Sequence, residues 1–286
     1  MMNYRKMFRV KPGGKVRLDK IDPADIGDWK NRDEAEALIG DNTRKLAELQ
    51  YKLYAENRQS LLIILQAMDA GGKDGVINHV LAPMNPQGCR VQGFKVPSAE
   101  EAGHDFLWRI HRAAPRNGEV VIFNRSHYED VLVARVHKLV PKKIWSERYE
   151  FINDFEKMLL AHHTRVVKFF LHISKEEQLA RFEERLDEKD KHWKISENDY
   201  RERAYWDDYM AAFEDALSKC STVDCPWYVI PSNHKWFRNL AVSQILVETM
   251  KDMDMQMPQP TVDIATIRRL IEQEKHPETA EADRKA

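Results

Sequence analysis

The stretch "LLIILQAMDAGGKDGVINHVL", residues 61–81, places one lysine and two aspartates in and beside a glycine-rich turn. A strand that ends in such a turn and restarts as a helix leaves several backbone N–H groups unpaired, and the helix dipole adds about half a positive charge there. Anions bind at such points, and Lys73 can reach terminal phosphates as the lysine of a Walker A loop does. The sequence therefore predicts a phosphate loop made of Ala70, Gly71, Gly72, Lys73, Asp74 and Gly75.

This loop departs from the GxxxxGK[ST] pattern at both ends. Ala67 replaces the first glycine, and Asp74 replaces the hydroxyl residue that binds metal. An ordinary strand-to-helix turn with a surface lysine is the alternative interpretation. Asp69 is the best candidate for a carboxylate that binds a metal ion, and its alternative is a turn aspartate that caps the following helix.

A second group of polar residues ends the apolar run in "VVIFNRSHYED", where a Walker B carboxylate would stand at the carboxyl edge of the sheet. Asn124 holds that place, and an amide binds a metal or its water weakly and brings no charge. Arg125 can clamp a phosphate through its planar fork, or it can pair with Glu129 or Asp130 as a structural salt bridge.

Two further residues follow Arg125 within one turn. We place Tyr128, together with Glu129, among the candidates for the nucleotide site. We expect His127 to be packed or exposed rather than catalytic, because no nearby Ser or Cys has the arrangement of an activated nucleophile.

A highly charged stretch lies between Ser174 and Cys220. Arg181 and Arg185 are four apart and share one helix face, and Lys194 follows at the predicted turn. Beside a phosphate loop these residues favour a basic lid over about 175–220, because arginines meet the charge on a migrating phosphoryl group. The alternative is an exposed helix with weak ion pairs.

Strand-like and helix-like segments alternate along the chain, which predicts a parallel sheet covered on both faces. We expect an α/β, P-loop kinase-like three-layer sandwich with about five parallel strands, in one domain over 1–258 that includes an N-terminal extension, followed by a polar tail over 259–286. The expected strands are 61–66, 90–96, 119–124, 166–173 and 226–231, and the main helices are 35–59, 100–114, 142–163 and 236–253.

The 286 residues are 43% hydrophobic and carry a net charge of −1. This composition predicts a soluble protein with a real core, and it argues against a protein that coats nucleic acid while allowing a local basic groove. With no membrane-length apolar run and no secretory signal, the cytoplasm is the expected location. Cys89, Cys220 and Cys225 lack the spacing of a disulfide framework or a zinc site.

Together "MDAGGKDG", "FNRSHYEDVL", "HISKEEQLARFEERL" and "KHWKIS" resemble the polyphosphate kinase 2 family over about residues 10–250. The resemblance implies a P-loop kinase fold with a lid, Mg²⁺ or Mn²⁺, and phosphoryl transfer between inorganic polyphosphate and AMP, ADP or ATP. Glu129 and Asp130 make the chain similar to the subgroup that phosphorylates both AMP and ADP. The resemblance also assigns functional roles to Asp69 with Lys73, Asn124 with Arg125, and Arg181 or Arg185 with Lys194.

Two alternatives remain open on the sequence. An ATP-dependent nucleotide or nucleoside kinase would have the same sheet, loop and lid, and a non-catalytic module would bind polyphosphate or nucleotide without transfer. For the transferase, Mg²⁺ prefers hard oxygen ligands such as Asp69 and Asp74, with Asn124 a weaker candidate. We also expect a homo-oligomer, because the helices over 35–59 and 142–163 suit subunit packing.

Overall fold

The computed structural model describes residues 3–275, and these contain a five-stranded sheet in which every neighbouring pair is parallel. The strands are β1 (Ser60–Gln66), β2 (Cys89–Gly93), β3 (Val120–Asn124), β4 (Thr164–His172) and β5 (Trp227–Pro231). Their spatial order is β2-β3-β1-β4-β5. The crossovers place β1 at the centre, and the predicted α/β class is confirmed.

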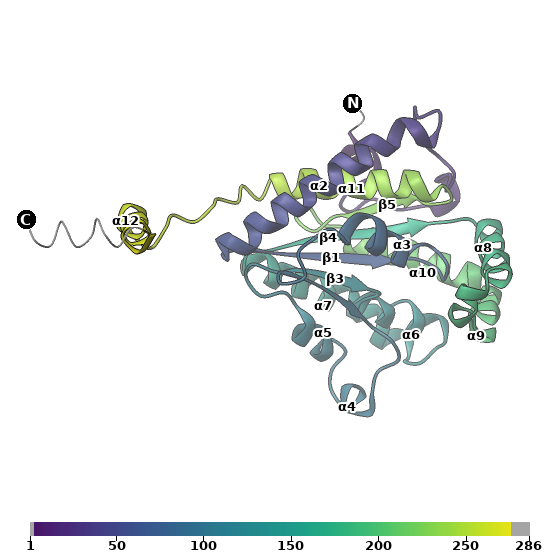
Figure 1. Ribbon diagram of the computed structural model, residues 1–286. Helices are drawn as coiled ribbons and strands as arrows, with labels where there is room; N and C mark the ends of the chain where they lie inside the picture. The colour runs from purple at the N-terminus through teal and green to yellow at the C-terminus, as the bar shows by residue number, and fades with distance from the viewer. Residues whose placement is uncertain (1–2, 276–286) are drawn as a thin grey trace, which may run out of the picture. The chain divides into compact units, whose positions relative to one another are not determined.

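Helices cover both faces of this sheet (Figure 1). On one face lie α2 (Arg32–Glu56) and α11 (Lys235–Lys251), and on the other lie α7 (Lys142–Ala161) and α10 (Trp206–Cys220). Side chains of β1 alternate between the two cores, because successive residues of a strand point to opposite faces. Leu61 and Ile63 belong to the core under α2 and α11, and Leu62 belongs to the other.

The remaining elements are shorter and connect or flank the layers. They comprise α1 (Tyr4–Phe8), α3 (Lys73–Val76), α4 (Ala99–Ala102), α5 (Trp108–Ala113), α6 (Val133–Val136), α8 (Lys175–Asp187), α9 (Glu197–Arg201), short 3₁₀ helices at Leu18–Lys20, His127–Asp130, Lys189–Lys194 and Glu202–Tyr205, and a π-helical turn at Ile77–Leu81. The helix predicted over 100–114 is two helices, α4 and α5. A capping box between Ser98 and Glu101 starts α4, which ends at Gly103.

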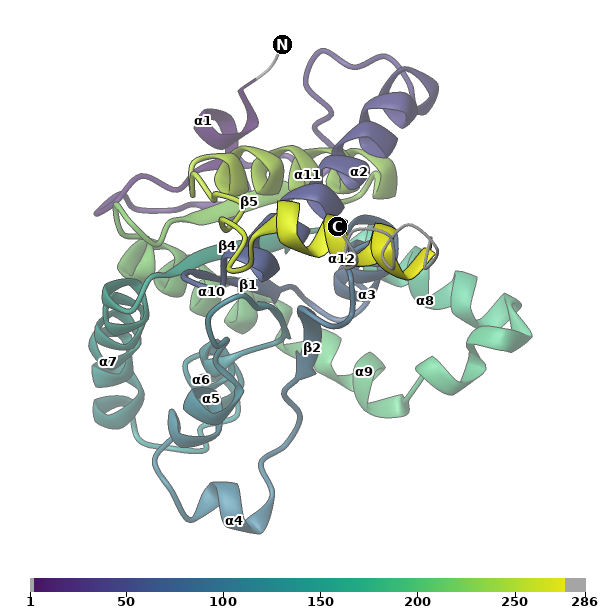
Figure 2. The same cartoon turned by 60° about the vertical axis from the view of Figure 1, so that its left-hand side comes forward.

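Two segments differ in detail from their predicted roles. Helix α2, expected to be available for subunit packing, buries Ala35, Leu46 and Leu53 in the core that it shares with α11. Helix α10 lies within the predicted lid range, but it buries Phe213 and Leu217 against the sheet. The part of the lid range that stands outside the sheet layers is therefore α8, α9 and the turns around them (Figure 2).

The chain divides into two compact units, 1–255 and 256–286. The predicted polar tail, 259–286, falls in the second unit, where α12 (Ile264–Lys275) is a helix that was not predicted from the sequence. Its apolar residues Ile264, Ile267, Leu270 and Ile271 recur at helical spacing and are exposed. The stretch "HPETAEADRKA", the last part of the predicted polar tail, lies outside the described residues. No helix within 3–275 combines the length and apolar character needed to cross a membrane.

Candidate active site

The phosphate loop joins the end of β1 to the start of α3 and opens into a cavity of about 1280 Å³. Gly72 and Ala70 have positive φ angles of 102° and 58°. The positive φ of Gly72 is a conformation that favours glycine, whereas the one at Ala70 is strained. All six predicted loop residues, Ala70, Gly71, Gly72, Lys73, Asp74 and Gly75, line the cavity.

Lys73 is buried at the base of the loop. Its Nζ donates to the carbonyl oxygens of Ala67 and Met68, at 3.2 and 3.4 Å. Burial, aided by the positive charge of Arg125, lowers the pKa of Lys73 to about 8. A phosphate at the loop would supply the negative charge that stabilises the protonated amine.

Arg125 connects the end of β3 to the phosphate loop. The register that pairs Leu65 with Asn124 brings the two strand ends together, and the guanidinium Nη2 lies 2.5 Å from Asp69 Oδ1. The guanidinium Nη1 of Arg125 lies 3.4 Å from Glu129 Oε2, which is a longer contact. Burial acts to lower the pKa of Arg125, but Glu129 and Asp69 raise it overall, so the guanidinium stays charged. The backbone of Arg125 has a φ of 65°, a second strained residue at this edge.

The three residues predicted to bind metal lie along the same edge. The amide Nδ2 of Asn124 donates to Asp74 Oδ1 at 2.9 Å, and Lys194 Nζ lies 3.9 Å from Asp74 Oδ2. Asp69 is paired with Arg125. Within the described part of the chain, no three His, Cys, Asp or Glu side chains converge on one point. This donor set fits Mg²⁺, which takes one or two carboxylates and completes its shell with water and substrate phosphates.

The turn after Arg125 is fixed by a buried polar cluster. Tyr128 is fully buried, and its hydroxyl donates to Glu156 Oε1 at 2.8 Å and accepts from Lys168 Nζ at 3.0 Å. This corrects the expectation that Tyr128 faces the nucleotide, because its hydroxyl is bonded within the core. His127 is also fully buried, and burial lowers its pKa, so its neutral ring is packed away from the cavity.

Helix α8 begins against the phosphate loop. Gln178 donates to the carbonyl of Asp69 at 2.9 Å, and Arg181 donates to the carbonyl of Ala70 at 2.8 Å. Arg181 also binds the carbonyls of Ser232 and Asn233 and the carboxylate of its helix neighbour Glu177, and it is 5% exposed. Its hydrogen bonds therefore hold the strained Ala70 in place, and because Arg181 also lines the cavity, its predicted role in the transfer stays a prediction.

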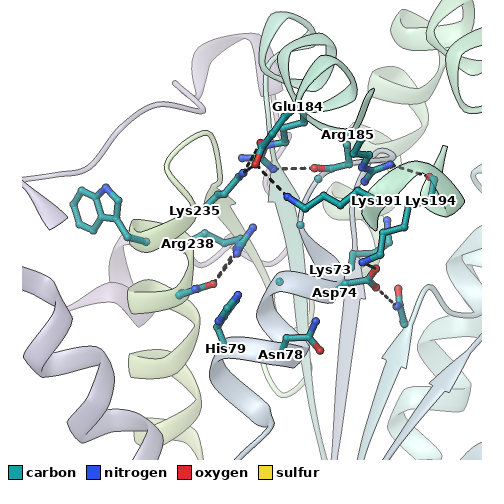
Figure 3. A pocket seen from close by; sticks show the side chains of 18 of the residues that line it. Lys73, Asp74, Asn78, His79, Glu184, Arg185, Lys191, Lys194, Lys235 and Arg238 are labelled. Atoms are coloured by element: carbon teal, nitrogen blue, oxygen red, sulfur yellow. Dashed lines mark hydrogen bonds and ion pairs between the residues drawn. The ribbon is translucent and has the colours of Figure 1, made fainter. Parts of the chain in front are cut away.

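The second half of α8 and the following turn present basic side chains to the cavity. Arg185 donates to the carbonyl of Lys194 at 3.3 Å and lies over the ring of Phe182. Lys191 and Lys194 line the cavity beside the loop (Figure 3). The predicted lid cations Arg181, Arg185 and Lys194 thus all line the cavity, and their contacts with phosphate stay a prediction.

The first turn of α11 forms the opposite wall, which the sequence analysis missed. Lys235 and Arg238 lie across from the lid lysines, with Asn78 and His79 below them (Figure 3). A signal was present in "PSNHKWFRN", because this segment follows the fifth strand, and ligands bind at the carboxyl ends of parallel strands. Lys235 pairs with Glu184 of α8 at 2.6 Å, so the two walls are joined across the cavity.

The family model described as polyphosphate kinase 2 matches residues 29–258. The chain belongs to the polyphosphate kinase 2 family. It is 51% identical over 257 residues to an AMP/ADP-polyphosphate phosphotransferase of Meiothermus ruber, a match that covers 89% of this chain and 96% of that protein. It is 47% identical over 272 residues to an ADP-polyphosphate phosphotransferase of Rhodopseudomonas palustris, which covers 90% and 93% of the two chains.

A solved structure agrees with this assignment. The crystal structure of polyphosphate kinase 2 from Arthrobacter aurescens superposes with a TM-score of 0.91 at 42% identity and covers 95% of this chain and 97% of that one. The predicted family and fold are therefore confirmed, and the cavity described above is the expected place for the chemistry of a polyphosphate kinase 2. Phosphoryl transfer of this kind generally requires a divalent metal.

Proposed function

We infer that the chain is a polyphosphate-dependent nucleotide kinase that transfers a phosphoryl group between inorganic polyphosphate and AMP or ADP. The single observation that carries this inference is the charge of the cavity. Among the described residues, ten Lys or Arg and five Asp or Glu line it, although the whole chain has a net charge of −1. A concentrated positive surface of this size suits two polyanionic substrates in contact.

In the transfer, an oxygen of the acceptor phosphate attacks the terminal phosphorus of polyphosphate in line. One P–O bond forms, the bond to the bridging oxygen breaks, and the shortened polyphosphate leaves with the electron pair. The acceptor phosphate is already ionised near neutral pH, so no general base is required. We propose that the loop amides and Lys73 hold the transferred group, and that Arg125 and Arg185 offset its charge.

Asp69 and Asp74 are the residues that we propose to hold Mg²⁺ or Mn²⁺, which supplies charge neutralisation between donor and acceptor. Asn124 is better suited to orient Asp74, because its amide nitrogen donates to that carboxylate. Asp69 shares its carboxylate with Arg125, so a metal and the guanidinium would be held by one residue. The proposed metal sites would explain why a loop that binds phosphate carries two carboxylates.

The proposed activity is tested with AMP, long-chain polyphosphate and Mg²⁺, with products separated by ion-exchange chromatography. We expect ADP and then ATP in the absence of any other phosphoryl donor. Absence of product under these conditions, together with turnover from ATP to a nucleoside, would favour an ATP-dependent kinase instead. Binding of polyphosphate without transfer, and a Lys73→Ala variant that only weakens that binding, would favour a non-catalytic module.

A homo-oligomer stays a prediction. Helix α7 exposes Ile144, Phe151 and Met158, which are spaced seven residues apart and therefore lie on one face. We propose this face as the packing surface between copies. Light scattering of the wild type and of Phe151→Asp tests it, and a molar mass that is the same for both would contradict the proposal.

A further inference from the structure

Arg238 has the most unusual environment of the charged side chains around the cavity. It is 2% exposed, and its Nε and Nη2 donate to Asn239 Oδ1 at 3.1 and 2.8 Å. No ion pair joins its guanidinium to a carboxylate anywhere in the described part of the chain. Burial, together with the positive charge of Arg181, lowers the pKa of Arg238 to about 9.

The guanidinium packs directly against the phosphate loop. A Cβ atom added to Gly72 would lie 1.9 Å from Arg238 Nη1, and one added to Gly75 would lie 2.6 Å from Nη2. Both glycines therefore leave the space that the planar group occupies, and any larger residue would displace it. The contact fixes the side of the loop that faces α11, whereas Arg181 fixes the carbonyl of Ala70 on the lid side.

The energetic position of Arg238 is unfavourable without a ligand. A buried cation without an anionic partner is destabilised by the loss of its hydration, even after relaxation of its surroundings. Arg238 also stands in the first turn of α11, where the helix dipole disfavours positive charge. The neighbouring guanidinium of Arg181 adds to the same positive potential. An anion in the adjoining cavity would relieve all of these terms together.

We propose that Arg238 is a positioning residue of the phosphate loop: it holds Gly72 and Gly75 in the phosphate-binding conformation, and the charge of the bound polyphosphate is the counter-ion that it lacks. This inference rests on the proposed function. It explains why the chain retains an arginine at a buried position where an apolar side chain of similar length would cost less. The free protein is less stable because of Arg238, and the liganded protein is more stable.

Tripolyphosphate binding and thermal unfolding together test the proposal. For Arg238→Met, which keeps the length and removes the charge, we expect the melting temperature of the free protein to stay the same or rise, and the Kd for tripolyphosphate to rise about tenfold. Lys251→Met is the control, because it removes one charge from the exposed far end of the same helix. If Arg238 had an ordinary structural role, its substitution would instead lower the melting temperature of the free protein, and the affinity for tripolyphosphate would fall as a result.

Arg238→Lys is a second variant that tests the same proposal, and it can be used if Arg238→Met does not fold. It keeps the charge but loses the planar contact with the two glycines, so we expect kcat to fall about tenfold while the Kd for tripolyphosphate changes less than about threefold. An unchanged kcat, or wild-type tripolyphosphate affinity in Arg238→Met, would overturn the inference. Turnover of AMP by the wild type with polyphosphate is measured in parallel, and its absence would contradict the proposed function rather than the role of Arg238.

Discussion

Lys73, Arg125 and Asp69 show how single side chains reconcile a phosphate loop with nearby carboxylates. Asp69 follows β1 and Arg125 follows β3, and Asp69 Oδ1 lies 2.5 Å from Arg125 Nη2. The negative charge of Asp69 therefore positions a cation. Lys73 is bonded to two carbonyls of its own loop and is only partly stabilised as a cation. Both groups are therefore positioned before substrate arrives, which lowers the cost of ordering them during the reaction.

The lowered pKa of Lys73 predicts a pH limit on substrate binding. Below about pH 8 the amine is protonated in the free protein, and above that pH it is neutral and must take up a proton to hold phosphate. We therefore expect kcat/KM for long-chain polyphosphate to fall as pH rises through about 8. The pH profile of initial rates measures this, since AMP and polyphosphate are already ionised there. A flat profile up to about pH 9.5 would show that Lys73 keeps an ordinary pKa.

Asp69→Asn removes the charge while keeping the shape of the side chain. We expect kcat to fall about 10²-fold or more, because the variant loses both the proposed metal ligand and the partner of Arg125. The Mg²⁺ concentration at half-maximal rate should rise as well. Steady-state rates over a Mg²⁺ titration measure both effects. A variant with reduced kcat but wild-type Mg²⁺ dependence would leave Asp69 with the ion pair alone.

Sequence reasoning found the loop and the end of β3 because strand-to-loop transitions carry local signals. Lys73 and Arg125 both follow apolar runs, and both line the cavity. It misplaced Tyr128, because residues in one turn point in different directions, and only the packing of Glu156 and Lys168 decides which side chain is buried. It missed Arg238: the position of this residue after the fifth strand indicated the ligand edge of the sheet, but its packing against the phosphate loop is a contact between distant parts of the chain that the sequence does not reveal.

At the scale of elements, α8 and α11 form two basic walls with the phosphate loop between them (Figure 3). Glu184 of α8 accepts hydrogen bonds from Lys235 of α11 at 2.6 and 2.9 Å, and it lies 3.4 Å from Lys191. The side chains of this group are about half exposed, so the pairs add little stability. Their effect is to neutralise two lysines that a polyanion would otherwise meet.

Glu184→Gln should therefore strengthen polyphosphate binding. Removal of the carboxylate frees Lys191 and Lys235 and removes a repulsive charge from the cavity, so we expect the KM for polyphosphate to fall up to about fivefold at low salt. Glu183→Gln is the matched control, because Glu183 is exposed on the same helix and does not line the cavity. Steady-state kinetics at two salt concentrations measure the effect. An increased KM would indicate instead that the Glu184 pairs hold the lid in its binding position.

At the scale of the molecule, the parallel sheet and both helix layers follow from alternation of strands and helices, which the sequence displays clearly, whereas the strand order β2-β3-β1-β4-β5 was not predicted. Another exception is the helix α12, which was not predicted. Its apolar face is exposed in the described structure, so no contact with a core indicated this helix. All residues that line the cavity fall between Arg32 and Asn239. The proposed site thus belongs to the unit 1–255.

A chain that ends at residue 258 should consequently keep its activity. It contains the whole compact unit 1–255 and the whole range matched by the family model. We expect kcat and the KM for polyphosphate to stay within about a factor of two of the full chain, because no cavity residue is removed. Side-by-side rates and melting curves test this. A large loss of rate with an unchanged melting temperature would indicate that the C-terminal unit contributes to the site.

The excess of positive charge in the cavity predicts that the KM for polyphosphate depends on salt concentration. The whole chain has a net charge of −1, whereas in the cavity lining cations outnumber acidic residues by ten to five within the described residues, so we expect this lining to attract polyphosphate. Salt shortens the range of this attraction, from roughly 30 Å at 0.01 M to roughly 8 Å at 0.15 M. We expect the KM for polyphosphate to rise steeply over this interval at fixed free Mg²⁺, with a smaller rise in the KM for AMP because AMP carries fewer charges. Equal salt dependence for the two substrates would contradict a cavity whose excess charge serves the polymer.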